Sequence, residues 1–319
     1  MAKCFSFTAS RDRFYRYSFK NAGLQSVSTD LGDGTTMQCW VPKTHEQSKP
    51  TLLLIHGFGA NAMWQYGHLL RHFTPRFNIY VPDLLFFGRS FTTRPERTEF
   101  FQAQCVMKVM EVHGVSKMSL VGISYGGFVG YSMAVQFPEK IERLVLCCTG
   151  VCLEEKDMSE GLFKVSDLEE AASILLPQTP EKLRELMRFS YVKPVKCVPS
   201  WFLKDFIHVM CTEHLNEKRE LIQSILKDRK LSILPKINQL PTFIIWGEKD
   251  QIFPVELGHR LKRHVGESAQ ITIINNAGHA VNLEKPTEFT KHLKSFLIDS
   301  TSSPQTLPLK NQIHDNKLD

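Results

Sequence analysis

The chain has 319 residues, and its formal charge of +6 (39 basic and 33 acidic side chains) is spread over its length. A hydrophobic content of 42 % excludes a disordered or collagen-like chain. No apolar run approaches the length of about 18 residues that crosses a membrane. The dispersed charge gives no reason to expect a nucleic-acid surface. We therefore expect a globular protein with a large core, no integral membrane segment and no nucleic-acid partner.

The first part of the chain, residues 1–23, is a basic N-terminal extension without a secretory apolar run. The chain also has eight cysteines, with no CxxC pair and no spacing typical of zinc ligands. We interpret them as reduced, mostly buried thiols, because a chain of this size needs no disulfides. These features predict a cytoplasmic protein, with targeting to an organelle through the basic extension as the alternative.

Strand-like and helix-like segments alternate along most of the chain. Segments 24–29 and 35–41 flank a turn-rich pentapeptide and predict an antiparallel hairpin. Six apolar runs suit strands buried on both faces and lie at 51–55, 78–81, 118–121, 144–148, 242–246 and 270–274. Helical patterns lie between most of them, at 62–73, 98–113, 125–137, 255–265 and 287–297. The pattern predicts an α/β fold with a mainly parallel eight-stranded sheet and helices on both faces.

One interval interrupts this alternation. Residues 153–235 contain amphipathic helical stripes and no convincing strand, which predicts an inserted helical cap. The core then comprises residues 24–152 and 236–299, and the polar tail at 300–319 is expected to be disordered. A cap over the carboxyl edge of a parallel sheet would wall the crevice in which such folds bind ligands.

A possible nucleophile lies in the segment Gly122-Ile123-Ser124-Tyr125-Gly126, a G-x-S-x-G pattern. By itself the pattern is weak, since a glycine-rich packing turn would look the same. Here it follows an apolar strand and begins a helix, which is the context of a nucleophile elbow. We therefore predict that Ser124 projects from a strained turn at the sheet edge.

A serine nucleophile needs a base and a group that orients the base. His279 follows the last predicted strand, and Asp250 follows the strand before it, with Glu248 as a nearby alternative carboxylate. The order Ser124, Asp250, His279 is the chain order of an α/β-hydrolase triad. We predict these three residues as the catalytic groups.

An acyl-transfer site also needs hydrogen-bond donors for the developing oxyanion. The segment His56-Gly57-Phe58-Gly59 follows the first parallel strand, where a donor loop belongs. We predict the backbone N–H groups of Phe58 and Tyr125 as the oxyanion hole. His56 is expected to brace this loop, and Asp83 to act as its structural partner.

At these residues the sequence resembles the α/β-hydrolase fold family. The motifs HGFG at 56–59, GISYGG at 122–127, WGEKD at 246–250 and NAGH at 276–279 occur in the family's order. Within the family the chain is similar to cap-bearing plant hydrolases, monoacylglycerol lipases and carbon–carbon bond hydrolases. The segment 83–90 is similar to one in epoxide hydrolases, but those enzymes attack with a carboxylate where this chain has Ser124.

The resemblance implies a serine hydrolase that cleaves carboxylic esters of small or medium apolar molecules through an acyl-enzyme. The alternatives are a carbon–carbon bond hydrolase with the same triad and a hormone-receptor-like protein with slow hydrolysis. Six aromatic side chains are candidates for substrate contact: Trp64, Phe86, Phe87, Tyr191, Trp201 and Phe206. No nucleotide or metal motif is found, so we expect no cofactor and no metal. The oligomeric state stays open between monomer and dimer.

Overall fold

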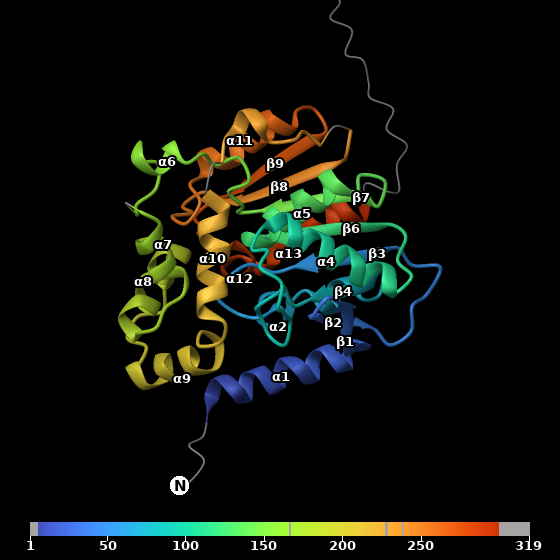
Figure 1. The fold of residues 1–319 in the computed structure, drawn as a ribbon, viewed down its shortest axis with the longest axis horizontal. Helices are drawn as coiled ribbons and strands as arrows, with labels where there is room; N and C mark the ends of the chain where they lie inside the picture. Colours follow the sequence, from blue (N-terminus) through green and yellow to red (C-terminus); the bar gives the residue numbers. More distant parts are fainter. Residues whose placement is uncertain (1–5, 166, 227–228, 238, 300–319) are drawn as a thin grey trace, which may run out of the picture.

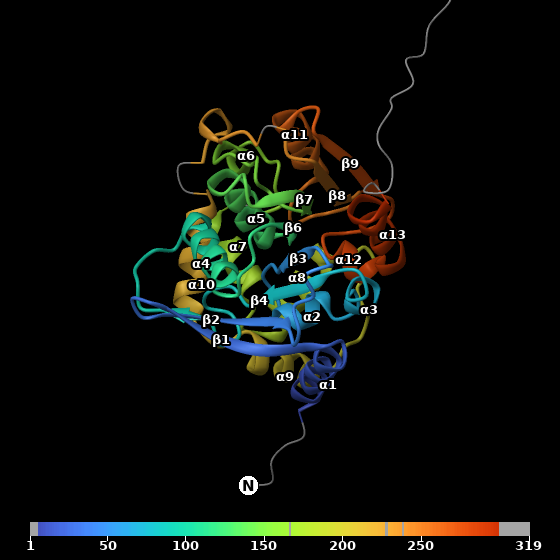
Figure 2. The same cartoon turned by 90° about the vertical axis from the view of Figure 1, so that its right-hand side faces the viewer.

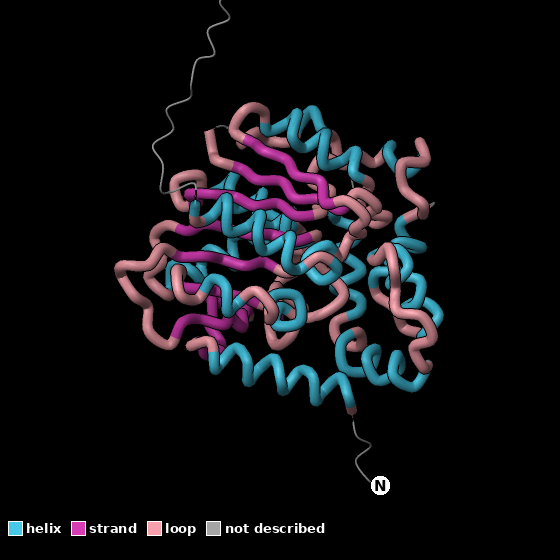
Figure 3. The backbone as a smooth tube through the Cα atoms, turned by 180° about the vertical axis from the view of Figure 1, so that it is seen from behind, coloured by secondary structure: helices cyan, strands magenta, loops and turns pink. Residues whose placement is uncertain are grey.

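The structure is a computed structural model that describes residues 6–165, 167–226, 229–237 and 239–299. A twisted sheet runs through its centre, and a group of helices lies beyond one end of the strands (Figure 1). Figure 3 shows the strands from behind, with helices along the sheet. The tail at 300–319, for which the sequence predicts disorder, lies outside the described residues.

The sheet contains nine strands. They are β1 (Leu24–Gly32), β2 (Thr35–Pro42), β3 (Thr51–Ile55), β4 (Asn78–Pro82), β5 (Phe91–Thr92), β6 (Met118–Ile123), β7 (Ile141–Cys147), β8 (Thr242–Gly247) and β9 (Ala269–Ile274). Eight follow the order β1-β2-β4-β3-β6-β7-β8-β9, and the two-residue β5 pairs with β2. The pairs from β4 to β9 are parallel, whereas β2 is antiparallel to both β1 and β4. The predicted eight-stranded, mainly parallel sheet is confirmed, and β5 is an addition.

Helices lie on both faces of the sheet. They are α1 (Phe7–Asn21), α2 (Ala62–Tyr66), α3 (Leu70–Phe73), α4 (Glu99–Val112), α5 (Tyr125–Gln136), α6 (Lys156–Ser159), α7 (Leu168–Leu175), α8 (Pro180–Ser190), α9 (Ser200–Met210), α10 (Leu215–Leu226), α11 (Val255–Val265), α12 (Val281–Glu284) and α13 (Pro286–Leu297). Figure 2 shows α4 and α5 on one face and α12 and α13 on the other. The single helix predicted at 62–73 is wrong, because a turn beginning at Gly67, a weak helix former, separates α2 from α3.

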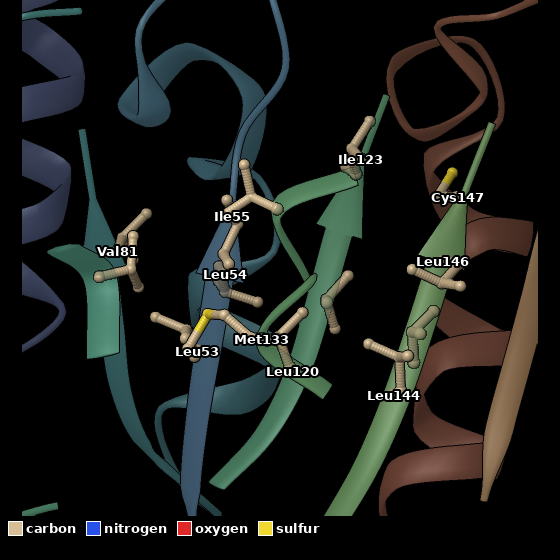
Figure 4. Close-up of a cluster of buried hydrophobic side chains, with 14 of the residues drawn as sticks. Leu53, Leu54, Ile55, Val81, Leu120, Ile123, Met133, Leu144, Leu146 and Cys147 are labelled. Atoms are coloured by element: carbon tan, nitrogen blue, oxygen red, sulfur yellow. The ribbon is translucent and has the colours of Figure 1, made fainter. Parts of the chain in front are cut away.

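The core lies along the parallel strands. Every residue of β3, β4, β6 and β8 is buried. Figure 4 shows Leu53, Leu120 and Leu144, one from each of three neighbouring strands, in the same buried cluster. Strands buried on both faces require continuous apolar runs, which is why the sequence pattern located them within a few residues of their true ends.

The basic N-terminal extension forms a helix, α1, which the sequence analysis did not predict. The Ser6 hydroxyl caps it by accepting from the Ala9 N–H at 3.0 Å. Phe19 is buried against Trp40 of β2 at a ring-centroid distance of 5.0 Å. At its other end, the Thr8 N–H donates to the Asp205 carboxylate of α9 at 2.8 Å. Helix α1 therefore connects the sheet with the helices of the insertion.

The insertion between β7 and β8 contains α6 to α10. Four buried side chains hold α8 and α9 together: Leu183, Leu203, Ile207 and Cys211. A second cluster joins α7 and α10 and contains Ala172, Leu176 and Ile222. Leu221 and Ile225 of α10 belong to the main core instead. Helix α10 thus attaches the insertion to the sheet, and Figure 1 shows it between the sheet and α7 to α9.

Two further sequence expectations concern membranes and thiols. In the part of the chain that the structure describes, no helix is both long and apolar enough to cross a bilayer. The described cysteines are free thiols, and all of them except Cys197 are buried. The expectation of unpaired, mostly buried cysteines is therefore confirmed for these residues.

Candidate active site

Ser124 lies on a sharp turn between β6 and α5. Its backbone has φ 54° and ψ −121°, which is strained for a side-chain-bearing residue. A Cβ at Gly126 would overlap the carbonyl oxygen of Ile55, and one at Gly122 would overlap the carbonyl of Gly126. The two flanking glycines are therefore required by close backbone approach, and they allow the turn that presents the serine.

The structure brings the three predicted catalytic side chains together. His279 Nε2 lies 2.9 Å from Ser124 Oγ, and His279 Nδ1 lies 2.8 Å from Asp250 Oδ2. The Asp250 side chain is fully buried, and that of His279 is 13 % exposed. The imidazole is thus held between a hydroxyl and a carboxylate, which is the geometry of a nucleophile with its base and orienting group.

Backbone contacts fix the carboxylate and the imidazole. Asp250 Oδ1 accepts from the N–H groups of Ile252 and Phe253, both at 2.9 Å. The Phe253 ring packs against His279 with centroids 5.6 Å apart. The neighbouring Glu248, considered as an alternative, accepts from the Asn276 N–H instead, at 2.8 Å. Asp250 is therefore the carboxylate that faces the histidine.

The loop after β3 reaches the same place. A Cβ at Gly57 would lie 2.7 Å from Ser124 Cβ, so this loop passes directly beside the serine. The Phe58 ring packs edge-to-face on Tyr125 at 5.1 Å. Among the described residues, the backbone N–H groups of Phe58 and Tyr125 have no acceptor. Both are therefore free to donate to a substrate oxygen.

Gln65 of α2 holds this loop, and the sequence analysis did not identify it. Its side-chain oxygen accepts from the Gly57 N–H, and its Nε2 donates to the Gly57 carbonyl, each at 2.9 Å. The same Nε2 also contacts the carbonyls of Phe58 and Ala60 at 3.2 Å. A glutamine in a helical pattern looks like a surface residue, so only the folded chain reveals its role.

His56 braces the loop, as the sequence predicted. Its Nε2 accepts from the Leu84 N–H at 3.0 Å, so Nδ1 carries the proton and donates to the Gly57 carbonyl at 2.8 Å. Burial lowers the pKa of His56 to about 4, which keeps the ring neutral. The nearby Asp83 is also buried, which raises its pKa to about 7, and it accepts from the Ala62 N–H at 3.3 Å. Both residues support the loop rather than the reacting atoms.

Two cavities lie near the three side chains, although none of the three lines either cavity. The first has a volume of about 80 Å³ and is lined by Phe58 and Gly59 together with residues of α7, α9 and α10. The second also has a volume of about 80 Å³ and is lined almost entirely by apolar side chains, including Phe253. Leu175 of α7 lines both, so the insertion covers the site from the side of the strand ends.

The six aromatic candidates for substrate contact are not brought together. Only Phe87 lines one of these two cavities. Trp64 packs between Tyr15 and Phe206, and its indole N–H is held by Asp12 at 3.2 Å. Trp201 is 57 % exposed and packs on Phe7 of α1.

The other two candidates lie outside both cavities as well. Phe86 is buried beneath the Arg97 guanidinium, which lies 4.7 Å from its ring centroid. Tyr191 follows the last residue of α8, and its backbone passes beside Gly278, just before His279. The sequence predicted that aromatic side chains line a pocket, but it did not predict which of these side chains face it.

A fourth side chain, Cys148, lies beside Asp250 and His279, and ligand atoms of the three are within 4.8 Å of one another. Such a group resembles a metal site by composition. The carboxylate and imidazole are already hydrogen-bonded to each other, however, and burial raises the pKa of Cys148 well above its ordinary value. The hydrogen bonds of His279 therefore join the group to Ser124.

Comparisons with known proteins agree with this fold. A model of the alpha/beta hydrolase fold family matches residues 50–190. The chain is 26 % identical to monoacylglycerol lipase ABHD6 of Bos taurus, over 84 % of this chain and 82 % of that protein. It is also 26 % identical to Lipase 3 of a Moraxella species, with 89 % and 88 % covered. The crystal structure of a putative lipase from Acinetobacter baumannii superimposes with a TM-score of 0.79 at 23 % identity, covering 95 % of this chain and 99 % of that one.

The chain therefore has the α/β-hydrolase fold. Over most of its length the chain is similar to curated proteins that include monoacylglycerol lipases and a bacterial lipase.

Proposed function

We propose that this protein is a serine hydrolase that cleaves carboxylic esters of small to medium apolar molecules through an acyl-enzyme. The observation that carries the proposal is the continuous hydrogen-bonded series from Ser124 through His279 to Asp250, at 2.9 and 2.8 Å. Its lipase relatives support ester bonds as the substrate class.

In the proposed reaction, His279 Nε2 removes the proton from Ser124 Oγ as the oxygen attacks the ester carbonyl carbon. The N–H groups of Phe58 and Tyr125 stabilise the oxyanion that forms. The imidazolium, stabilised by Asp250, then protonates the alcohol oxygen, which leaves with its hydrogen. Water repeats the sequence on the acyl-enzyme, with His279 again as base, and releases the carboxylic acid and free Ser124.

We further propose that residues 153–235 act as a cap that selects the substrate. The apolar cavity beside Phe253 is suited to an acyl chain, because burying aliphatic carbon there removes it from water. Four insertion helices, α6, α7, α8 and α10, contribute residues to this cavity. The strand-end loops would thus perform the chemistry, and the cap would determine which esters enter.

Carbon–carbon bond cleavage by the same three residues is not favoured. A structurally similar dienoate hydrolase from a Rhodococcus strain is 18 % identical, a level that indicates the fold alone. The receptor-like alternative predicts slow single turnover, whereas the proposed enzyme turns over repeatedly. A panel of esters and vinylogous diketones, assayed for multiple turnover, distinguishes these three functions.

The nucleophile is tested by labelling with a fluorophosphonate and locating the adduct by peptide mass spectrometry. We expect one adduct on Ser124 and none in Ser124→Ala. Ser132→Ala, which removes another hydroxyl from the same α5 helix, is the matched control and should label like the wild type. Labelling of Ser124→Ala at the wild-type rate would overturn the proposal.

A further inference from the structure

Lys218 of α10 is a buried cation in the cavity beside the oxyanion loop. The residue is 5 % exposed, although lysines are among the side chains most rarely buried. It lines the first cavity together with Phe58 and Gly59. Its charge also contributes, after the larger effect of burial, to the low pKa of His56 in that loop. A positive charge therefore lies close to the proposed catalytic centre.

The ammonium group has few partners. Lys218 Nζ donates to the backbone carbonyl of Glu213 at 2.9 Å and lies 4.9 Å from the centroid of the Phe87 ring. No carboxylate in the described part of the chain lies within ion-pair distance of it. An ammonium has three donors, so hydrogen-bonding capacity remains for a group inside the cavity.

Burial without an anion is unfavourable for this charge. Desolvation lowers the pKa of Lys218 below its ordinary value, and the charges of Glu213 and Glu217 offset only part of this effect. Glu213 also lines the cavity, but no ion pair joins it to Lys218 among the described residues. A bound anion would offset the lost hydration of the ammonium.

The two cavities divide a substrate into two parts. The acyl chain fits the apolar cavity at the Phe253 side of His279. The first cavity, on the Phe58 side, is then left for the alcohol part of the ester. Leu175 lines both cavities, so they adjoin at α7.

We infer that Lys218 selects esters whose alcohol part carries a phosphate or carboxylate group, which the ammonium binds in the cavity beside Phe58. This inference rests on the proposed function and names the substrate class of the same site. Lys218 is here a specificity-determining residue that touches the substrate away from the reacting carbonyl.

The test compares three decanoyl esters with one acyl chain: monodecanoylglycerol, decanoylglycerol 3-phosphate and the decanoyl ester of glyceric acid. We expect the wild type to have a kcat/KM at least about tenfold higher for the two anionic esters, equivalent to ~1.4 kcal/mol. The phosphate and carboxylate arms show which anion fits better. Lys218→Met should remove the preference.

Lys204→Met, which removes an exposed lysine of α9 in the same insertion, is the matched control and should keep the preference. The ratio of anionic to neutral turnover is independent of the fraction of folded enzyme. An unchanged ratio in Lys218→Met, or no preference in the wild type, overturns the inference.

A binding measurement separates this inference from the proposed chemistry. Calorimetry of decanoylglycerol 3-phosphate with Ser124→Ala, and with the double variant Ser124→Ala/Lys218→Met, requires no turnover. We expect at least about tenfold weaker binding to the double variant. If none of the esters is hydrolysed, the proposed function fails, whereas equal binding to both variants shows that Lys218 does not recognise the anion.

Discussion

The strand-end loops and the helical insertion are built differently, although both border the same site. Ser124, Gly57 and Asp250 are held by backbone hydrogen bonds and by contacts too close for any side chain. Helices α8 and α9 are held by a small apolar cluster of their own. Directional contacts fix positions to fractions of an ångström, while apolar packing tolerates changes of shape and size. This difference supports the proposal that the loops perform the chemistry and the insertion selects the substrate.

The largest expected effect concerns the orienting carboxylate. Asp250→Asn should lower kcat for a p-nitrophenyl ester by about 10³–10⁴-fold, because an amide favours the wrong tautomer of His279. The Asn side-chain oxygen can still accept from the N–H groups of Ile252 and Phe253. Steady-state kinetics are the measurement, and Glu248→Gln is the matched control, with a change of less than about threefold expected. The reverse ranking of the two variants would assign the role to Glu248.

A smaller effect is expected from the close backbone contacts. A Cβ at Gly126 would overlap the rigid Ile55 carbonyl, so Gly126→Ala should lower the free energy of unfolding by about 3 kcal/mol or more. At Gly130, also on α5, the new Cβ would lie 2.6 Å from Leu120 Cδ2, the end of a side chain that can rotate. Gly130→Ala should therefore cost about 1 kcal/mol or less. Urea unfolding measures both, and equal losses would mean that the glycine contacts are not decisive.

The insertion can be loosened by itself. Leu203→Ala removes a side chain from the cluster between α8 and α9, at a cost of about 2–3 kcal/mol. Hydrogen exchange should show lower protection in α8 and α9, with β6 and β7 unchanged and fluorophosphonate labelling altered by less than about threefold. Simultaneous loss of protection in β6 would show that both regions unfold as one unit.

The last prediction concerns the pH dependence of stability at Asp83, beside the loop after β3. Burial raises the pKa of Asp83 to about 7 from 3.8, so between these values the native state holds a proton that the unfolded state has released. Wild-type stability therefore falls as pH rises through this window, and the penalty is complete above about pH 7. Asp83→Asn lacks this penalty, so its stability relative to wild type should rise by up to ~3 kcal/mol from pH 4.5 to 8 in urea titrations. The opposite contribution of the lowered His56 pKa cancels, because both proteins contain His56. A difference that does not vary with pH would contradict buried ionisation of Asp83.

Site residues that directly follow a strand could be located from the sequence. Ser124, Asp250 and His279 each follow an apolar run, and parallel strands bring their carboxyl ends to one edge. Gln65 was missed because a polar residue in a helical pattern normally faces water. The loop after β3 folds back over α2, so Gln65 Nε2 contacts three of its backbone carbonyls.

Side chains whose environment depends on distant elements could not be located. Lys218 belongs to a charged helix and would be expected in solvent, but α10 turns that face onto the loop after β3. Trp201 was assigned to the pocket by its type, yet α9 presents it toward α1. Amphipathic periodicity shows that a helix has a buried face and leaves open what that face covers.

Local sequence patterns alone thus predicted the strands, their parallel arrangement and the three residues that follow them. Apolar runs and tight glycine turns depend on residues that are neighbours in the sequence. Only the tertiary structure decided the lining of the cavities, the support of the loop after β3 and the burial of Lys218. These three features depend on how segments that are distant in the sequence pack against one another. A short stretch of sequence does not specify such contacts.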